Sequence, residues 1–443
     1  MNVSVFEKDS IPKTYLKLSF PVVLGSLVSI IYNITDTFFI AQTQNTELVT
    51  GVSLCTPVFT LLMALGNIFG QGGNSVISRL LGQKNLSAAK KASSFCFYAA
   101  LFSGFLLGFF LLSFRTPALK FLGADSTVFS YASDYYSVMA LGAPLAVFSF
   151  VPMNLLRSEG MAVCSMAGTI GGSVINMLLD PIFIFHFRWG SAGAAAATVI
   201  GYLFSDLFYA AVILKKSRLL SLNLQNARIS FPLIREITGI GASAALSNVT
   251  QSVAQVLTNQ FLLPYGNLSI AAMGIAQKIN LIVLLVITGF SFGGLPLIGY
   301  FFGGKQSQKL KRLIGFSFSF LLSVTAILSL LVFLGAPFLL SCFMADPSII
   351  QAGTLMLRLQ VFSMVFVAIA LYITVFFQAV GRVKSTLLLS GSRQGFVFLL
   401  VLPLSAWLLG YLGVLWAQSI SNMLTALAAI ILFYRYRRGD QSL

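Results

Sequence analysis

Long apolar runs, separated by short polar segments, occupy most of the chain. A helix needs about 20 apolar residues to cross the hydrocarbon core of a bilayer. Twelve runs are long enough, and we place them at residues 14–41, 49–79, 92–114, 126–155, 161–186, 190–214, 236–264, 268–302, 313–340, 348–378, 385–409 and 411–434. The last two are divided at Gly410 and Gly413, because the uncharged stretch around them is too long for one span. The pattern predicts an all-α polytopic membrane protein with twelve transmembrane helices.

Composition agrees with this pattern and excludes soluble fold classes. Of the 443 residues, 57% are hydrophobic and 9% are charged, and the mean hydropathy is +0.90. A soluble domain would carry about 25% charged residues. The net charge of +16 would suggest nucleic acid as a partner for a soluble protein. In a membrane protein the basic residues belong to short loops, so we expect a lipid bilayer as partner and no nucleic acid.

The Lys and Arg residues are distributed unevenly between the two sides of the predicted spans. With the N-terminus inside, 22 fall in cytoplasmic segments and three, Arg115, Lys120 and Arg188, fall in the opposite loops. Basic residues mark cytoplasmic loops, and one missed span would scramble this division. We therefore expect a multi-pass protein with both termini in the cytoplasm. Lys13 and Lys17 open the first run, which is long and therefore predicts a retained span.

The two halves of the chain repeat each other at an offset of 221 residues. The offset pairs Phe69 with Phe290, Gly72 with Gly293, Gly82 with Gly303 and Gly160 with Gly381. Each half has six predicted spans, an even number, so both halves insert with the same orientation about an axis along the membrane normal. We predict two pseudo-symmetric six-helix lobes with a central cleft: an N-lobe at 1–214, a cytoplasmic linker at 215–235 and a C-lobe at 236–443.

Three acidic residues lie deep inside predicted spans, and all three belong to the first half: Asp36, Asp180 and Asp206. A carboxylate at such depth is costly in lipid and indicates an ion or proton pathway. Asn176 lies one helical turn before Asp180 on the same face. Carboxylate, amide and hydroxyl oxygens are hard ligands that suit alkali cations. We predict a Na⁺ or H⁺ site made of Asp36, Asn176, Asp180 and Thr198.

Alternatives to a functional role stay open for three polar residues of this half. Thr198 lies among small residues where helices approach closely, and Asn33 lies one turn before Asp36. Both could simply satisfy other polar groups between helices. Asp206 lies nearer the cytoplasmic half of its span and could be a packing or gating residue.

The second half has no acid deep inside a span, and the offset of 221 sets Val401 opposite Asp180. It carries a set of neutral polar residues at other positions. The seventh span carries a polar stripe on one helix face, which would keep a cleft wet or else bond neighbouring helices. Aromatic and Met side chains elsewhere would suit flat, lipophilic cations, although most of them face lipid or pack in the core. The residues predicted to line a substrate cleft are Asn33, Phe150, Met153, Asn154, Gln251, Gln255, Asn259, Gln277 and Arg393.

Motifs of soluble enzymes do not occur in the sequence. There is no Walker loop, so we expect no ATP site. His186 is the only histidine, which excludes histidine metal clusters and catalytic triads. The four Cys residues show no metal-ligand or disulfide spacing. We expect a protein that is not an enzyme and needs no cofactor besides a coupling ion.

Five motifs, in order along the chain, carry a resemblance to a known family. They are Asn33-Ile-Thr-Asp36 in span one, Gly70-Gln-Gly-Gly-Asn-Ser75 in span two, Asn176-Met-Leu-Leu-Asp180-Pro181 in span five, Gly193-Ala-Ala-Ala-Ala-Thr198 in span six and Arg393-Gln394 in span eleven. With the twelve spans and the repeat, the chain resembles, essentially end to end, the multidrug and toxic compound extrusion (MATE) transporters. Within that family it resembles the MepA-type bacterial exporters.

The resemblance implies the MATE/MOP fold with a V-shaped cleft, in the cytoplasmic (inner) membrane of a bacterium, and we expect a monomer. It implies antiport by alternating access, in which Na⁺ or H⁺ enters and an organic cation or amphiphilic drug leaves. The cation site of the family maps onto Asp36, Asn176, Asp180 and Thr198. The chain departs from relatives with acids in spans seven and ten, which puts a second carboxylate site in doubt.

Two other functions fit the residues less well. A flippase for a lipid-linked precursor, from the same superfamily, would favour a strongly cationic cavity. Only Lys278, Arg358 and Arg393 are available for one. A channel would need a filter-like motif, which the duplicated sequence lacks. A cation-coupled exporter is the leading interpretation, and the flippase is its alternative.

Overall fold

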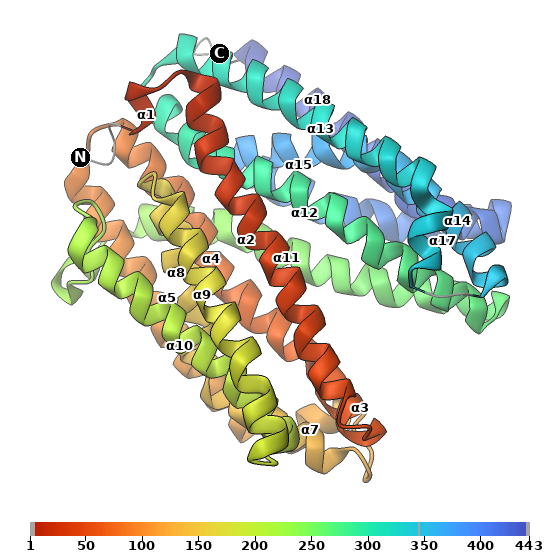
Figure 1. The fold of residues 1–443 in the computed structure, drawn as a ribbon. Coiled ribbons are helices and arrows are strands. Elements are labelled where there is room, and N and C mark those ends of the chain that lie inside the picture. The colour runs from red at the N-terminus through yellow and green to blue at the C-terminus, as the bar shows by residue number, and fades with distance from the viewer. Residues whose placement is uncertain (1–4, 344–345, 440–443) are drawn as a thin grey trace. The chain divides into compact units, whose positions relative to one another are not determined.

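The structure, a computed structural model, describes residues 5–343 and 346–439, and helices dominate both segments (Figure 1). The first half contains α1 (Val5–Lys8), α2 (Ile11–Ala41), α3 (Thr46–Leu54), α4 (Thr56–Gly82), α5 (Leu86–Ser113), α6 (Arg115–Phe121), α7 (Phe129–Leu141), α8 (Ala143–Ser158), α9 (Ala162–Pro181), the π-helical turn η2 (Ile182–His186) and α10 (Gly190–Lys216). The second half contains η3 (Leu224–Ala227), α11 (Phe231–Leu262), η4 (Leu263–Tyr265), α12 (Asn267–Gly303), α13 (Ser307–Ser341), α14 (Pro347–Phe362), α15 (Met364–Ala379), α16 (Val383–Gly391), the π-helical turn η5 (Ser392–Phe396), α17 (Val397–Leu409) and α18 (Tyr411–Gly439).

Helices occupy all twelve predicted spans. In the described chain, ten helical segments are long and apolar enough to cross a membrane, and the pair α7–α8, bent by 53°, can form an eleventh crossing. The remaining span is α11, whose 32 residues are long enough at about 1.5 Å per residue. Its polar stripe makes it less apolar than the others. The prediction of an all-α protein with twelve transmembrane helices is confirmed.

The chain forms two compact units, which share two helices. The first unit comprises Met1–Asp9 and Leu24–Ala245, and the second comprises Ser10–Val23 and Leu246–Leu443. Helix α2 therefore begins in the second unit and ends in the first, whereas α11 begins in the first and ends in the second. The lobe boundaries drawn from the sequence stay a prediction.

The half-length repeat is visible in the boundaries of the helices. Helix α8 begins at Ala143 and α15 at Met364, 221 positions later, and both have 16 residues. The same offset relates the starts of α5 and α13 and the ends of α4 and α12. Gly160 and Gly381, which precede α9 and α16, both have a φ of 81°, a left-handed conformation that glycine adopts without strain. The two halves therefore follow one helical plan.

In the first unit, α9 and α10 pack along a seam of small residues. A Cβ atom on Gly172 would lie 2.0 Å from Ser205 Oγ and 2.6 Å from Gly201 O. A Cβ atom on Gly201 would lie 2.8 Å from Gly172 O and 3.2 Å from Asn176 Cβ. The two backbones approach this closely because neither glycine has a side chain. The seam brings Asn176 of α9 next to Thr198 of α10.

The segment that follows α10 is held by polar contacts within the first unit. The Glu159 carboxylate, which is fully buried, accepts hydrogen bonds from the Ser217 hydroxyl at 2.5 Å and the Arg218 N–H at 3.2 Å. Burial raises the pKa of Glu159, although these two hydrogen bonds favour the ionised carboxylate. Tyr98 OH donates to Leu222 O at 2.5 Å. The connection towards α11 is therefore an ordered part of this unit.

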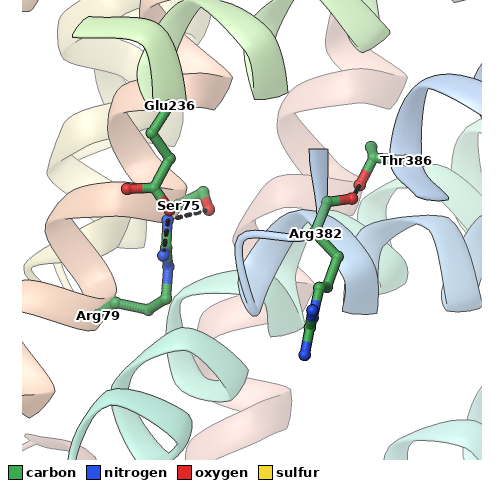
Figure 2. Close-up of polar contacts among 5 residues, drawn as sticks. All are labelled: Ser75, Arg79, Glu236, Arg382 and Thr386. Carbon is green, nitrogen blue, oxygen red and sulfur yellow. Dashed lines mark hydrogen bonds and ion pairs between the residues drawn. The ribbon is translucent and has the colours of Figure 1, made fainter. Parts of the chain in front are cut away.

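Arg79, near the end of α4, and Glu236, near the start of α11, form an ion pair of 2.5 Å (Figure 2). Arg79 also lies 3.5 Å from Ser75 Oγ, one turn earlier. The two side chains of the pair are 13% and 30% exposed, so the pair contributes at most about 1 kcal/mol. It forms where a Cβ atom on Gly72 would lie 2.0 Å from Ile237 O. Close backbone contact, more than charge, thus fixes the start of α11 against α4.

The second unit contains an apolar core, and some of its polar side chains pair with one another. Asn422 Nδ2 of α18 donates to Ser363 Oγ at 2.9 Å, and Asn422 Oδ1 accepts from Gln418 Nε2 at 3.0 Å. At the start of α16, the Thr386 hydroxyl donates to Arg382 O at 2.9 Å (Figure 2). These hydrogen bonds join polar groups within and between the helices of this unit.

Candidate functional site

Three of the four predicted cation ligands lie on two packed helices of the first unit. Asp180 and Asn176 lie one turn apart on α9, and they are 0% and 2% exposed. Asn176 Nδ2 donates to Thr198 Oγ1 of α10 at 3.1 Å. Thr198 in turn donates to Ala194 O at 3.1 Å, as a hydroxyl often does within a helix. This chain of contacts fixes the amide and the hydroxyl beside the buried carboxylate.

Asp36, the fourth predicted ligand, reaches the same group from α2 and is half-buried. Its carboxyl interacts electrostatically with the Asp180 carboxyl. Two ionised carboxylates only accept hydrogen bonds, so a bond between them requires a shared proton. Without a proton or a cation, the two negative charges repel each other in poorly hydrated surroundings. The pair therefore favours the uptake of positive charge.

Four oxygen atoms of this group are buried and unpaired. Asp36 Oδ1, Asn176 Oδ1 and both carboxylate oxygens of Asp180 accept no hydrogen bond from the described residues. An unpaired buried acceptor costs about 1–3 kcal/mol, and such atoms are rare in folded proteins. Carboxylate and amide oxygens are ligands for hard cations. The four atoms are therefore available to a cation or a proton.

A cavity of about 270 Å³ adjoins the group. Asp36 and Thr198 form part of its wall, whereas Asn176 and Asp180 lie behind the wall. The wall also has an aromatic and an aliphatic part. Its residues are Tyr32, Asn33, Asp36, Thr37, Ile40, Val49, Val52, Ser53, Thr56, Phe59, Tyr135 and Thr198. Of the four predicted ligands, Asp36 and Thr198 are therefore the two that line the cavity.

The helix changes its geometry directly after Asp180. Pro181 ends α9, and the next five residues form the π-helical turn η2. Proline has no N–H, so the carbonyl of Met177 loses its usual helical partner. Turns of this kind occur frequently at functional sites. Asp180 thus lies at a break where the helix can bend within the membrane.

Two tyrosines near the group were not predicted from the sequence. Tyr32 lies one turn before Asp36, and its hydroxyl is 3.4 Å from Thr198 Oγ1. Tyr135 of α7 lines the cavity and interacts electrostatically with Asp36. The four-residue spacing before Asp36 could have indicated Tyr32. Nothing in the sequence around Tyr135 points to this group, because only the tertiary fold brings α7 to α2.

Of the first-half residues predicted to line a substrate cleft, three lie on α8 and the fourth, Asn33, lies on α2. Asn33 is exposed, lines the cavity and donates to a carbonyl of its own helix at 2.7 Å. Asn154 is 4% exposed and donates to Phe150 O at 2.7 Å. The Phe150 ring packs against the Tyr202 ring at 6.4 Å between centroids, and Met153 is half-buried on the same helix. The structure places only Asn33 at the cavity, and the role of all four in substrate binding stays a prediction.

The second-half residues predicted for the cleft belong to the second unit. Gln255 Nε2 of α11 donates to Gln277 Oε1 of α12, which brings these two together. Gln251 is exposed and Asn259 is half-buried on the same helix as Gln255. Arg393 lies in η5, and no hydrogen bond or ion pair joins its guanidinium to another described residue. Their contact with a substrate stays a prediction.

The donor set of the first unit suits a monovalent cation or a proton. Within residues 5–343 and 346–439, no group of three or more His, Cys, Asp or Glu side chains could hold a metal ion. The group described above has two carboxylates, and an amide and a hydroxyl complete it. Transition metals favour nitrogen and sulfur ligands, which this group does not offer.

Comparison with known proteins places the chain in a family. The MatE family matches residues 21–182 and 243–407, one segment in each half. Multidrug export protein MepA of Staphylococcus saprophyticus subsp. saprophyticus is 32% identical over 432 residues, which cover 98% of this chain and 95% of that protein. Multidrug export protein MepA of Staphylococcus haemolyticus gives the same identity and coverage.

A solved structure shows the same fold. The crystal structure of a MATE protein in complex with MaL6 matches with a TM-score of 0.91 and 24% identity over 98% of each chain. The family resemblance inferred from the five sequence motifs is therefore confirmed. The chain belongs to the MatE family of membrane transporters.

Proposed function

We propose that this protein exports organic cations or amphiphilic drugs across a bacterial cytoplasmic membrane in exchange for Na⁺ or H⁺. The relatives that cover almost its whole length are named multidrug export proteins. The observation that carries the coupling proposal is the group of four unpaired, buried oxygen atoms on Asp36, Asn176 and Asp180. Such a group binds positive charge more favourably than it remains empty and ionised.

Asp36 and Asp180 act as the coupling residues in this proposal, and Asn176 and Thr198 support them. A Na⁺ ion would take oxygen ligands from the carboxylates and the Asn176 amide, whereas a proton would be shared between the carboxyls. Either event cancels negative charge beside the cavity. A cationic substrate near Asp36 is then held less strongly and leaves. Loss of the ion on the other side of the membrane restores the charge and the attraction.

Alternating access supplies the link between ion binding and transport in this proposal. An ion that moves down the membrane potential releases about 2.3 kcal/mol per charge per 100 mV, in addition to its concentration gradient. The break at Pro181 and η2 gives α9 a point at which it can bend. Occupation of Asp180 by the coupling ion would favour one of the two helix geometries.

The aromatic part of the cavity supports a cationic substrate. Tyr32, Phe59 and Tyr135 line the cavity with Asp36. Aromatic faces attract organic cations, by about 0.5–2 kcal/mol for each favourable contact. The distribution of Lys and Arg supports cytoplasmic termini, and we propose that a monomer carries out transport.

Proteoliposomes provide the test of this proposal. Purified protein is reconstituted into vesicles, and ethidium is added outside while the membrane potential is clamped. Three conditions are compared: a more acidic vesicle interior, a higher Na⁺ concentration inside, and no ion gradient. We expect one cation gradient to drive ethidium accumulation, and the gradient that works identifies the coupling ion. Protein-free vesicles and an ionophore that collapses the gradient are the controls. Equal accumulation with and without gradients would contradict antiport.

A further inference from the structure

A second buried carboxylate of the first unit lies outside the group described above. Asp206 of α10 is 6% exposed. Its Oδ1 accepts a hydrogen bond from the Ser149 hydroxyl of α8. Its Oδ2 is buried and receives no hydrogen bond from the described residues. One oxygen of this carboxylate is therefore hydrogen-bonded, and the other has a free lone pair.

No positive charge compensates Asp206. Within the described residues no Lys or Arg forms an ion pair with it, and its titratable neighbours are Tyr202 and Tyr209 of its own helix. Helix α8 contributes the Ser149 hydroxyl. Across the seam, Gly168 of α9 faces Tyr209 and Gly172 faces Ser205, and neither glycine has a polar side chain. Arg157 interacts electrostatically with Tyr209.

A buried and uncompensated carboxylate is strongly disfavoured as an anion, so it takes up a proton. A metal cation is a poorer occupant, because hard cations collect about six oxygen ligands. At Asp206 the Ser149 hydroxyl is already a donor, and it lies 3.4 Å from Tyr202 O as well, so few oxygen lone pairs are free for a metal ion. A proton needs a single lone pair, which Oδ2 offers.

The position of Asp206 connects it with the first carboxylate group. Thr198, Tyr202 and Asp206 follow one another at intervals of four residues, so they lie along one face of α10. Tyr202 interacts electrostatically with both Asp206 and Asp36. Beyond Asp206, Tyr209 OH donates to Ser165 O at 3.0 Å, towards the end of α10 that carries Lys215 and Lys216. A row of polar groups thus leads away from the cavity.

We propose that Asp206 is a second proton-binding site, and that it loses and regains its proton in the same cycle as the Asp36–Asp180 pair. When the proton leaves Oδ2 for water, the Ser149 O–H remains as a donor that stabilises the carboxylate. The link between Asp206 and the transport cycle rests on the proposed antiport, but the proton at Asp206 can be observed without transport. It adds a titrating group to the four residues that form the first site.

Infrared difference spectroscopy on the full chain in lipid vesicles tests the proposal. A protonated carboxyl group has a carbonyl-stretch band that the carboxylate lacks. We expect such a band in the wild type, its absence in Asp206→Asn, and its loss as the pH rises. Addition of tetraphenylphosphonium, the substrate probe, at constant pH should also remove the band. If the band persists in Asp206→Asn, it does not belong to Asp206 and the proposal fails. If the band belongs to Asp206 but responds to neither pH nor the probe, Asp206 does not lose and regain a proton.

Two further variants separate a proton site from a merely structural residue. Ser149→Ala removes the donor to the ionised form, so the band should persist to a higher pH. Ser205→Ala is the matched control: Ser205 is buried on the same helix and donates to Gly168 O and Gly201 O. It should leave the titration unchanged. A titration midpoint that Ser149→Ala does not move would contradict the role of this hydrogen bond.

The outcomes also distinguish this inference from the proposed function. If Asp180→Asn transports ethidium normally while the Asp206 band titrates, the first site fails and Asp206 stands as the coupling residue. If Asp180→Asn is inactive and no Asp206 band exists, the first site stands and the second is refuted.

Discussion

The two halves of the chain share a helical plan but differ in their buried chemistry. At an offset of 221, Asp36 corresponds to Leu257, Asn176 to Val397 and Asp180 to Val401. The offset also pairs Thr198 with Ser419, whose hydroxyl donates to Leu359 O at 2.8 Å. The polar group of the first half is therefore reduced, in the second, to one hydroxyl that donates to a backbone carbonyl of α14.

The surroundings of the buried amide groups also differ between the halves. In the second unit Asn422 is paired at both its Nδ2 and its Oδ1. In the first unit Asn176 Nδ2 is paired but its Oδ1 is not. Incomplete pairing alone does not mark a ligand, because Asn280 Oδ1 and Gln360 Oε1 of the second unit are also buried and unpaired within the described residues. What distinguishes Asn176 is that the buried carboxylate of Asp180 lies one turn away, whereas no acidic residue lies inside a span of the second unit. The two halves thus share their helix boundaries, whereas the buried carboxylates occur in the first half.

The largest expected effect comes from neutralising one carboxylate of the first half. Asp180→Asn and Asp36→Asn should each reduce gradient-driven ethidium accumulation to the level of protein-free vesicles, because the pair can no longer bind the coupling ion. Val401→Thr, a change of similar size at the position that corresponds to Asp180, is the matched control. It should keep at least half of the wild-type rate, by the rough tolerance of such swaps. Equal losses in the two halves would abolish the contrast.

The two buried asparagines should fail in different ways. Asn176→Ala removes an oxygen ligand, so we expect about a tenfold higher coupling-ion concentration for half-maximal transport. Asn422→Ala leaves Ser363 and Gln418 without their partner, which should destabilise the fold by about 1–3 kcal/mol. Ion-titrated transport and thermal unfolding in detergent measure the two effects. If Asn176→Ala lowers stability and leaves the ion dependence unchanged, Asn176 is a structural residue as well.

A smaller effect is expected from the exposed amides of the second unit. Gln255→Ala removes the hydrogen bond to Gln277 and one polar group of the α11 stripe. We expect the relative export of different cationic dyes to change about two- to fivefold, on the order of 1 kcal/mol or less, with an unchanged ion dependence. Competition between two dyes in one vesicle preparation measures the ratio. A change in ion dependence without a change in dye preference would reassign the stripe to coupling.

The smallest effect concerns Glu159, which lies outside the spans. Burial raises its pKa above the ordinary value of 4.5. A carboxyl with a raised folded-state pKa contributes stability when protonated and loses it as the pH rises through that pKa. Glu159→Gln should therefore flatten the fall in Tm between acidic and neutral pH, by on the order of a few degrees. An unchanged slope in this variant would assign the pH dependence to another group.

Much of the fold follows from the sequence, because single physical rules determine it. Bilayer thickness sets the length of each apolar run, and the repeat of Gly160 at Gly381 marks equivalent turns. The ends of helices were less predictable. The break at Cys55 falls within a run that hydrophobicity does not divide, and the π-helical turn η5 (Ser392–Phe396) falls inside a predicted span. They depend on packing against other helices.

The candidate site was predictable in part for a related reason. A carboxylate in an apolar run is conspicuous, so the sequence indicates Asp36 and Asp180, and helical spacing adds Asn176. Tyr135 could not be selected, because a tyrosine in an apolar span is common and only the fold brings it to Asp36. The open acceptor of Asp206 is likewise a matter of three-dimensional packing, since its partner Ser149 is 57 residues away.

Equilibrium binding tests the central claim most directly, because coupling between two ligands is reciprocal. The affinity of the purified protein for tetraphenylphosphonium is measured over a range of Na⁺ concentrations and of pH, for the wild type and for Asp180→Asn. We expect the wild-type affinity to weaken at least about fivefold as the coupling ion is raised, and the variant to bind the probe with no such dependence. An Asp180→Asn protein that retains the full dependence would show that the coupling ion binds elsewhere.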